Sequence, residues 1–225
     1  YSSDWGAYLL LSRGWQITPE IETTMHVDLR SQNGIAIGND TRIQREFSDT
    51  SISLYGMYDR DTPETTSGYN RRFESEDWRY RAALYHRQEL DQALTLRANA
   101  DLLSDVDMLE DWFKSEYRRT PQPKTFVNLV HDQPRFSVSL EARPRLNDFY
   151  TVSETLPELR LSLPRQTVAD GLPLLYQGTT TVGYHRMTWR DFDLDRPFPL
   201  NDPEDYDSLR LDSLHMPYWP FDVAR

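Results

Sequence analysis

Apolar and polar residues alternate strictly along residues 19–33. Over ten consecutive positions the side chains divide into an apolar set (Ile21, Thr23, Met25, Val27, Leu29) and a polar set (Glu22, Thr24, His26, Asp28, Arg30). Successive side chains of a β-strand point to opposite faces, whereas a helix would spread both sets around its surface. The stretch therefore predicts a strand with one apolar and one charged face.

The same period of two, interrupted by turn signals, recurs along the chain up to residue 187. Residues 104–113 differ and predict one short helix, with Ser104 or Asp105 as its N-cap. Most connections are short, and Asn33-Gly34 is a strong hairpin signal. Besides the stretch above, strands are expected at residues 5–17, 35–46, 51–59, 78–88, 94–102, 124–131, 135–143, 156–163 and 175–187. The pattern predicts an all-β antiparallel meander of about ten strands.

Two segments depart from this pattern. Residues 60–77 combine Thr, Pro, Gly and charged residues, which predicts a loop. From residue 188 onward, prolines stand among many aspartates, and residues 188–225 are expected to form a long loop or a poorly ordered end. Because the chain starts at Tyr1 and opens almost directly in a strand pattern, we expect it to be a fragment of a longer polypeptide.

Composition excludes several classes of protein. Hydrophobic residues make up 38% and the mean hydropathy is -0.73, and no run of about 18 apolar residues would form a helical membrane span. A transmembrane barrel is still allowed, because half of each barrel strand faces a polar lumen. The net charge of -11, with no basic patch, argues against nucleic-acid binding. The absence of Cys excludes disulfides and thiolate metal sites in this chain.

The charged faces allow two architectures. A soluble β-sandwich would expose them to water, whereas an outer-membrane β-barrel would enclose them around a hydrated lumen and turn the apolar faces to lipid. Aromatic residues near expected strand ends, such as Trp15, Tyr58 and Trp78, fit interfacial girdles but also occur in sandwiches. The expected strand lengths favour the barrel, because about 9 to 11 residues cross a membrane at a tilt.

Candidate catalytic and metal-binding residues are few. The acids Asp105, Asp107, Glu110 and Asp111 lack the glycine and spacing of a calcium loop and predict a capped, solvated turn. The acids between residues 191 and 207 predict a solvated loop, and no two histidines stand at metal-ligand spacing. No nucleophile elbow or glycine-rich phosphate loop is present. We therefore expect no enzyme activity, no metal and no cofactor.

Four motifs follow one another within residues 5–187. The first is Trp15-Gln16-Ile17-Thr18-Pro19 and the second is the turn at residues 30–34. The most specific stretch, residues 78–113, combines a Trp-led strand, His86, the hairpin return L-D-Q-A-L-T-L-R-A-N-A-D and the closing L-E-D-W-F. The last is Leu156-Pro157-Glu158-Leu159 before a strand. In this order the motifs resemble the N-terminal part of the barrel in the lipopolysaccharide-assembly outer-membrane protein family (LptD, or organic-solvent-tolerance family).

The resemblance implies transport and not catalysis. Family members receive lipopolysaccharide from a periplasmic bridge and insert it into the outer leaflet of the outer membrane, and a lipoprotein of the LptE type plugs the barrel. Residues 1–187 would then be part of a larger barrel that needs further strands to close. The implied partners are lipopolysaccharide, an LptE-type plug, membrane lipid, and bridge proteins reached through a missing N-terminal domain.

The resemblance also implies roles for particular residues. The family's lateral gate lies between the first and last strands, and the matching lip here would comprise Trp5, Tyr8, Leu10, Ser12, Gly14 and Trp15. Family prolines that weaken this seam correspond to Ser12 and Val27, so Gly14 would loosen the first strand instead. Residues expected to face the lumen are Glu22, His26, Asp28, Arg30, Arg79, Arg81, Arg97, Asp101, Arg135 and Glu141.

Two alternatives stay open, a general porin or other channel barrel and a soluble β-sandwich binding domain. Loop sidedness also raises a question. If a periplasmic domain precedes the first strand, strand parity places the long loop at residues 60–77 on the periplasmic side, which is unusual for an outer-membrane barrel.

Overall fold

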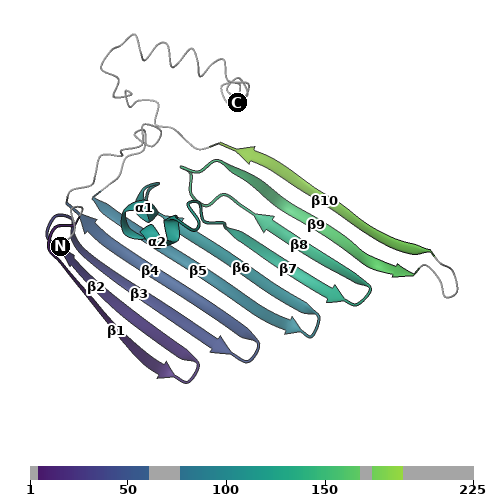
Figure 1. Cartoon of the computed structure of the whole chain (residues 1–225), viewed down its shortest axis with the longest axis horizontal. Coiled ribbons are helices and arrows are strands. Elements are labelled where there is room, and N and C mark those ends of the chain that lie inside the picture. The colour runs from purple at the N-terminus through teal and green to yellow at the C-terminus, as the bar shows by residue number, and fades with distance from the viewer. Residues whose placement is uncertain (1–4, 61–76, 168–173, 190–225) are drawn as a thin grey trace, which may run out of the picture. The chain divides into compact units, whose positions relative to one another are not determined.

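The alternating segments form one continuous antiparallel sheet in a computed structural model of the chain (Figure 1). The structure describes residues 5–60, 77–167 and 174–189. The chain separates into two units, and every described residue belongs to the first, Tyr1–Thr62 with Ser75–Asp191. The loop expected at residues 61–76, the acids from residue 191 onward and nearly all of the irregular end expected at residues 188–225 lie outside the described residues.

Each strand pairs with its neighbours in sequence, so the sheet is a ten-stranded meander. This confirms the predicted all-β antiparallel meander. Among the described residues the sheet stays open, because β1 pairs only with β2 and β10 only with β9. The strands are β1 (Tyr8–Thr18), β2 (Ile21–Arg30), β3 (Gly34–Arg45), β4 (Ser48–Asp59), β5 (Trp78–Asp91), β6 (Leu94–Leu103), β7 (Phe126–Gln133), β8 (Phe136–Arg143), β9 (Val152–Thr167) and β10 (Leu175–Thr188).

Strand β1 begins later than predicted, so Trp5 is not a strand residue. Gly6 has a φ of 67°, a left-handed conformation that interrupts an extended chain. The next residue, Ala7, donates its N–H to the Ser31 hydroxyl at 3.0 Å, which ties the chain to the β2–β3 turn before β1 starts. Gly34 closes that turn with a φ of 115°, as the Asn33-Gly34 signal leads one to expect.

Two short helices, α1 (Met108–Trp112) and α2 (Lys114–Tyr117), lie in the connection between β6 and β7. The sequence predicts one helix over residues 104–113, with Ser104 or Asp105 as its N-cap. This N-cap prediction is wrong, because the cap position is Asp107, which makes no side-chain capping bond. The Asp105 carboxylate binds Arg79 and also accepts from the Asp107 backbone N–H at 3.1 Å, a bond within the turn that precedes α1. No helix of the described residues is long and apolar enough to cross a membrane.

The register separates the two kinds of side chain across the sheet, because directly paired residues point to the same face. One row across β2 to β6 contains Thr24, Asp40, Ser53, Ala83 and Asp101. We call its side the charged face. A row on the other side, the apolar face, contains Leu29, Ile35, Tyr58 and Trp78.

The buried apolar residues lie on the charged face and in the connections, and not on the apolar face. Ala36, Met57 and Leu103 share the face of Asp28, Arg79 and Arg81 by register. They are buried together with residues of the β6–β7 and β8–β9 connections, namely Val106, Met108, Leu109 and Phe149. Figure 1 shows α1 and α2 over β5 and β6 near one end of these strands.

Candidate functional site

The apolar face exposes large side chains over the width of the sheet. Strands β2, β4, β6 and β8 place no charged residue on it. Ile37 and Leu54 are 56% and 50% exposed, although β3 and β4 are each paired with a strand on both sides. Val182 of β10, which pairs with β9, is 68% exposed. The exposed apolar residues of this face are Leu9, Leu11, Trp15, Met25, Leu29, Ile35, Ile37, Leu54, Tyr58, Trp78, Tyr80, Leu84, Val127, Leu140, Leu159, Leu161 and Val182.

Several polar side chains on the apolar face bond to one another. The Asn39 side-chain amide donates to the Thr23 hydroxyl at 2.8 Å. The Thr41 hydroxyl lies 2.9 Å from the Thr23 hydroxyl and donates to the Asn39 side-chain oxygen Oδ1 at 2.9 Å. Farther along the sheet, Thr50 lies 2.8 Å from His86 Nδ1. These groups therefore have hydrogen-bond partners that do not come from solvent, which suits an apolar environment.

The charged face is organised around Arg79, which is 1% exposed. Its Nε and Nη2 donate to the two oxygens of Asp105 at 2.9 and 2.7 Å. Its Nη1 donates to Asp111 of α1 at 2.9 Å and to Asp59 of β4 at 3.4 Å. One guanidinium thus joins β4, β5, the β6–β7 connection and α1. Burial raises the pKa of Asp111, an effect that the nearby Arg79 opposes.

Two further arginines attach the helices to the sheet. Arg81 donates to both oxygens of Asp101 at 3.1 and 2.8 Å, pairs with Glu116 of α2 at 2.8 Å, and lies 4.6 Å from the Phe113 ring centroid. Arg30 lies 3.8 Å from the Trp112 ring centroid and 4.4 Å from that of Trp5. Its Nη2 also donates to Asp28 at 3.1 Å. The helices are therefore held by ion pairs and by arginine–aromatic contacts.

The structure corrects the solvated turn predicted for the acids at 105–111. Asp105 and Asp107 are buried, and Asp105 and Asp111 bind Arg79, because the helices fold back onto the sheet. Within the described residues no group of three or more His, Cys, Asp or Glu side chains is placed to hold a metal ion.

The register places nine of the ten predicted lumen residues on the charged face, and Arg135 lies in the β7–β8 turn instead. Only some of them meet: Asp28 binds Arg30, and Arg81 binds Asp101. Asp59 and Glu116 are partners that the prediction missed. Asp59 lies on the same face of β4 as Ser51 and Ser53, so the alternation in β4 could have predicted it as a residue of the charged face. Glu116 lies in α2, a helix that no sequence signal predicted. The residues that share the charged face are Glu22, His26, Asp28, Arg30, Arg79, Arg81, Arg97, Asp101 and Glu141.

The predicted gate residues divide between both faces of β1. Tyr8, Leu10, Ser12 and Gly14 share the charged face with their β2 partners, and Trp15 lies on the apolar face. Trp5, outside the strand, stacks on Trp112 at 6.2 Å. Pairing with β2 continues through Ser12 and Gly14, and no strand pairs with the other edge of β1 among the described residues. The gate role of β1 stays a prediction.

No protein-family model matches the chain. A search of curated proteins gives no match.

Proposed function

We propose that this chain is part of an outer-membrane β-barrel that inserts lipopolysaccharide into the outer leaflet. The observation that carries the membrane assignment is the distribution of side chains over the sheet. Ion pairs and the small buried core lie on one face, while the opposite face is broad, apolar and exposed. In a barrel the apolar face would contact acyl chains and the charged face would line the lumen.

The energetic argument weighs against an apolar face in water. Full burial of one Leu, Ile or Val side chain contributes about 1.5–3 kcal/mol, and patches of several hundred Å² mark an interaction surface. A β-sandwich would cover this face with a second sheet. The described residues form a single sheet, and their buried apolar residues gather on its other side. Lipid is therefore the covering that we propose.

Connection lengths support an orientation. At one end of the sheet, β1–β2, β3–β4, β5–β6 and β7–β8 are each joined by two residues, and β9–β10 is the exception. At the other end, β2–β3 is also short, whereas the connections at residues 60–77, 104–125 and 144–151 are longer. Outer-membrane barrels have short periplasmic turns and longer external loops, so we propose that the helix-bearing end faces outward.

This orientation differs from the one that a periplasmic domain joined directly to β1 would impose. An additional strand on the unpaired edge of β1 would reconcile the two, and that strand would then replace β1 as a lip of the lateral gate. Either β1 or this additional strand would therefore be the lip of the gate. Cross-linking of cysteines placed on β1 to residues of the strand beside it in the membrane would distinguish the two arrangements.

The choice of lipopolysaccharide as the transported molecule rests on the motif resemblance, most of all on residues 78–113. The charged face is compatible with it, since arginines and carboxylates suit sugar and phosphate groups or a polar plug. A general channel barrel would use the same face for solutes, and this alternative must be distinguished by experiment.

A matched cysteine pair tests the membrane assignment. Ala82 and Ala83 are adjacent in β5, both half-buried, and point to the apolar and charged faces respectively. Because the sequence has no Cys, each substitution gives a single label. In membranes, a fluorophore on Ala82→Cys should be quenched by nitroxide lipids and one on Ala83→Cys by a water-soluble quencher. Equal quenching at both positions, or shielding of Ala82→Cys from both quenchers, contradicts the barrel.

Depletion of the protein in its host tests the transport function. We expect less lipopolysaccharide on the cell surface, measured with a lipopolysaccharide-binding antibody on intact cells, and its accumulation inside. Unchanged surface lipopolysaccharide with slower uptake of small solutes would favour the channel alternative.

A further inference from the structure

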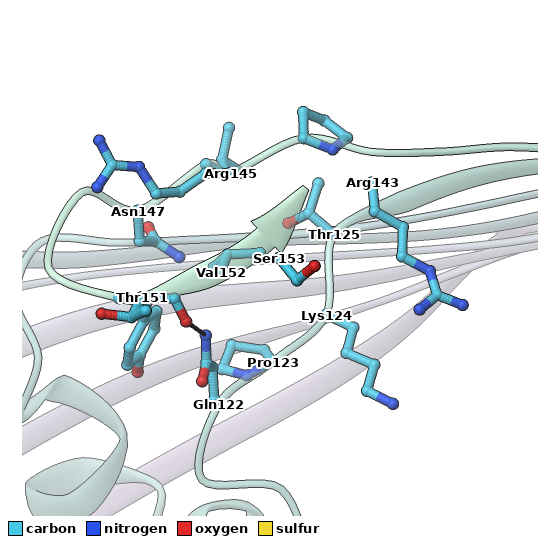
Figure 2. Close-up of a pocket in the computed structure, with 13 residues that line it drawn as sticks. Gln122, Pro123, Lys124, Thr125, Arg143, Arg145, Asn147, Thr151, Val152 and Ser153 are labelled. Carbon is cyan, nitrogen blue, oxygen red and sulfur yellow. Dashed lines mark hydrogen bonds between the residues drawn. The ribbon is translucent and has the colours of Figure 1, made fainter. Parts of the chain in front are cut away.

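A pocket of about 260 Å³ lies between the connections that precede β7 and follow β8 (Figure 2). The residues that line it include three cations, Lys124, Arg143 and Arg145, and no acid among those described. The whole chain has 36 acids and 25 basic residues, so a pocket without acids runs against the composition. The concentration of positive charge suggests a site for an anion.

The three cations are not equivalent. The Arg145 guanidinium donates to the carbonyl oxygens of Asp148 and Trp189 at 2.9 and 2.6 Å. Arg143 pairs with Glu141 at 2.5 Å and is half exposed. The Lys124 ammonium has no hydrogen-bond or ion-pair partner in the part of the chain that the structure describes. Figure 2 shows Lys124 and Arg143 extending toward the same side of the pocket, and Arg145 toward the other.

The surrounding chain holds this pocket in shape. The Asn147 side chain accepts from Leu103 N–H at 2.9 Å and donates to the Asp101 carbonyl oxygen at 2.8 Å. It thereby anchors the β8–β9 connection to β6 beyond the last β6–β7 pair, Asn99 with Phe126. On the other side, the Asn99 amide donates to the Lys124 carbonyl oxygen.

Two nearby carboxylates are already occupied. Glu141 accepts from Asn128 at 3.1 Å as well as from Arg143. Glu154, next to the lining residue Ser153, accepts from the Arg145 backbone N–H and from Arg186 and Thr188. They therefore leave the Lys124 ammonium available to a ligand.

We propose that this pocket binds a phosphate group, held by Lys124 and Arg143 with the Thr125 and Ser153 hydroxyls as neutral donors. A phosphate suits two cations better than a carboxylate does, because it carries more charge and more acceptor oxygens. The phosphorylated sugars of lipopolysaccharide would be its ligand in the membrane, and that choice of source rests on the function proposed above. The pocket lies at the helix-bearing end, which we orient outward.

The two lysines of the sequence, Lys114 and Lys124, permit a footprinting test with an internal control. The protein in detergent is acetylated with and without glucosamine 1-phosphate, inorganic phosphate or lipopolysaccharide micelles. At a ligand concentration ten times the dissociation constant, the acetylation rate of Lys124 should fall about 11-fold and that of Lys114 should not change. The probe that protects at the lowest concentration identifies the source of the phosphate.

Variants and a dephosphorylated ligand complete the test. Arg143→Gln should weaken binding of glucosamine 1-phosphate about 10- to 100-fold, and Lys114→Gln should leave it unchanged. Equal protection of Lys124 by glucosamine, or no protection by any phosphate, overturns the proposal. Protection by glucosamine 1-phosphate in a protein whose depletion leaves surface lipopolysaccharide unchanged would keep the phosphate site and remove the transport function.

Discussion

Replacement of Arg79 by Met tests whether one buried guanidinium holds the helices on the charged face. The substitution keeps an apolar stem of similar length but removes the donors to Asp59, Asp105 and Asp111. Asp59 and Asp105 are buried, so water cannot replace Arg79 without a structural change. Carboxylates left in this way must take up protons or draw the helices away from the sheet.

The expected cost follows from the burial of the group. Breaking a buried ion pair by removing one partner costs about 3–5 kcal/mol, which is about a 100- to 4,000-fold decrease in the ratio of folded to unfolded protein. Arg87→Met is a matched control, because Arg87 stands on the same face of β5 and forms an exposed pair with Glu89 at 3.0 Å. Loss of that pair should cost about 0–1 kcal/mol.

The assay is denaturant unfolding of the protein in detergent, combined with hydrogen exchange of the amides at residues 107–117. Arg79→Met should lower the unfolding midpoint and speed exchange in α1 and α2, and Arg79→Lys should fall between it and the wild type because it keeps the charge but loses the bidentate geometry. Equal midpoints and equal exchange for Arg79→Met and Arg87→Met would refute the reasoning.

Three further predictions concern single positions. Gly34→Ala should destabilise the sheet by about 1 kcal/mol or more, because φ at Gly34 is 115° and an added Cβ would lie 2.4 Å from the Tyr58 carbonyl oxygen. Gly56→Ala is the control and should not destabilise the sheet, because an added Cβ would have nothing within 4 Å. The unfolding midpoints of the two variants test this difference. Asn147→Ala should cost about 1–3 kcal/mol through the unsatisfied β6 backbone, with faster exchange at Leu103 N–H as the readout. Burial raises the pKa of Asp111, so the folded state binds its proton more tightly. Wild type should therefore gain stability relative to Asp111→Asn as the pH falls from about 7 to about 4, and an unchanged difference in midpoint would contradict this.

Much of the sheet was predictable because strand period and turn chemistry act locally. The polar set that includes Asp28 and Arg30 and the apolar set that includes Val27 and Leu29 do lie on opposite faces. Trp5 was wrongly placed in β1, because its packing on Trp112 joins residues more than a hundred positions apart. The N-cap predicted at Ser104 or Asp105 was also wrong: Asp105 binds the distant Arg79 and accepts from the Asp107 backbone N–H, and α1 begins only at Met108.

The order of the strands and the two-faced character of the sheet follow from the sequence alone, because alternation and short hairpins leave a meander as the simplest arrangement. Only the tertiary structure decided which charges meet. Arg79 gathers three carboxylates and Lys124 faces a pocket because segments distant in sequence fold over the same sheet end, and a local pattern contains no information about such distances.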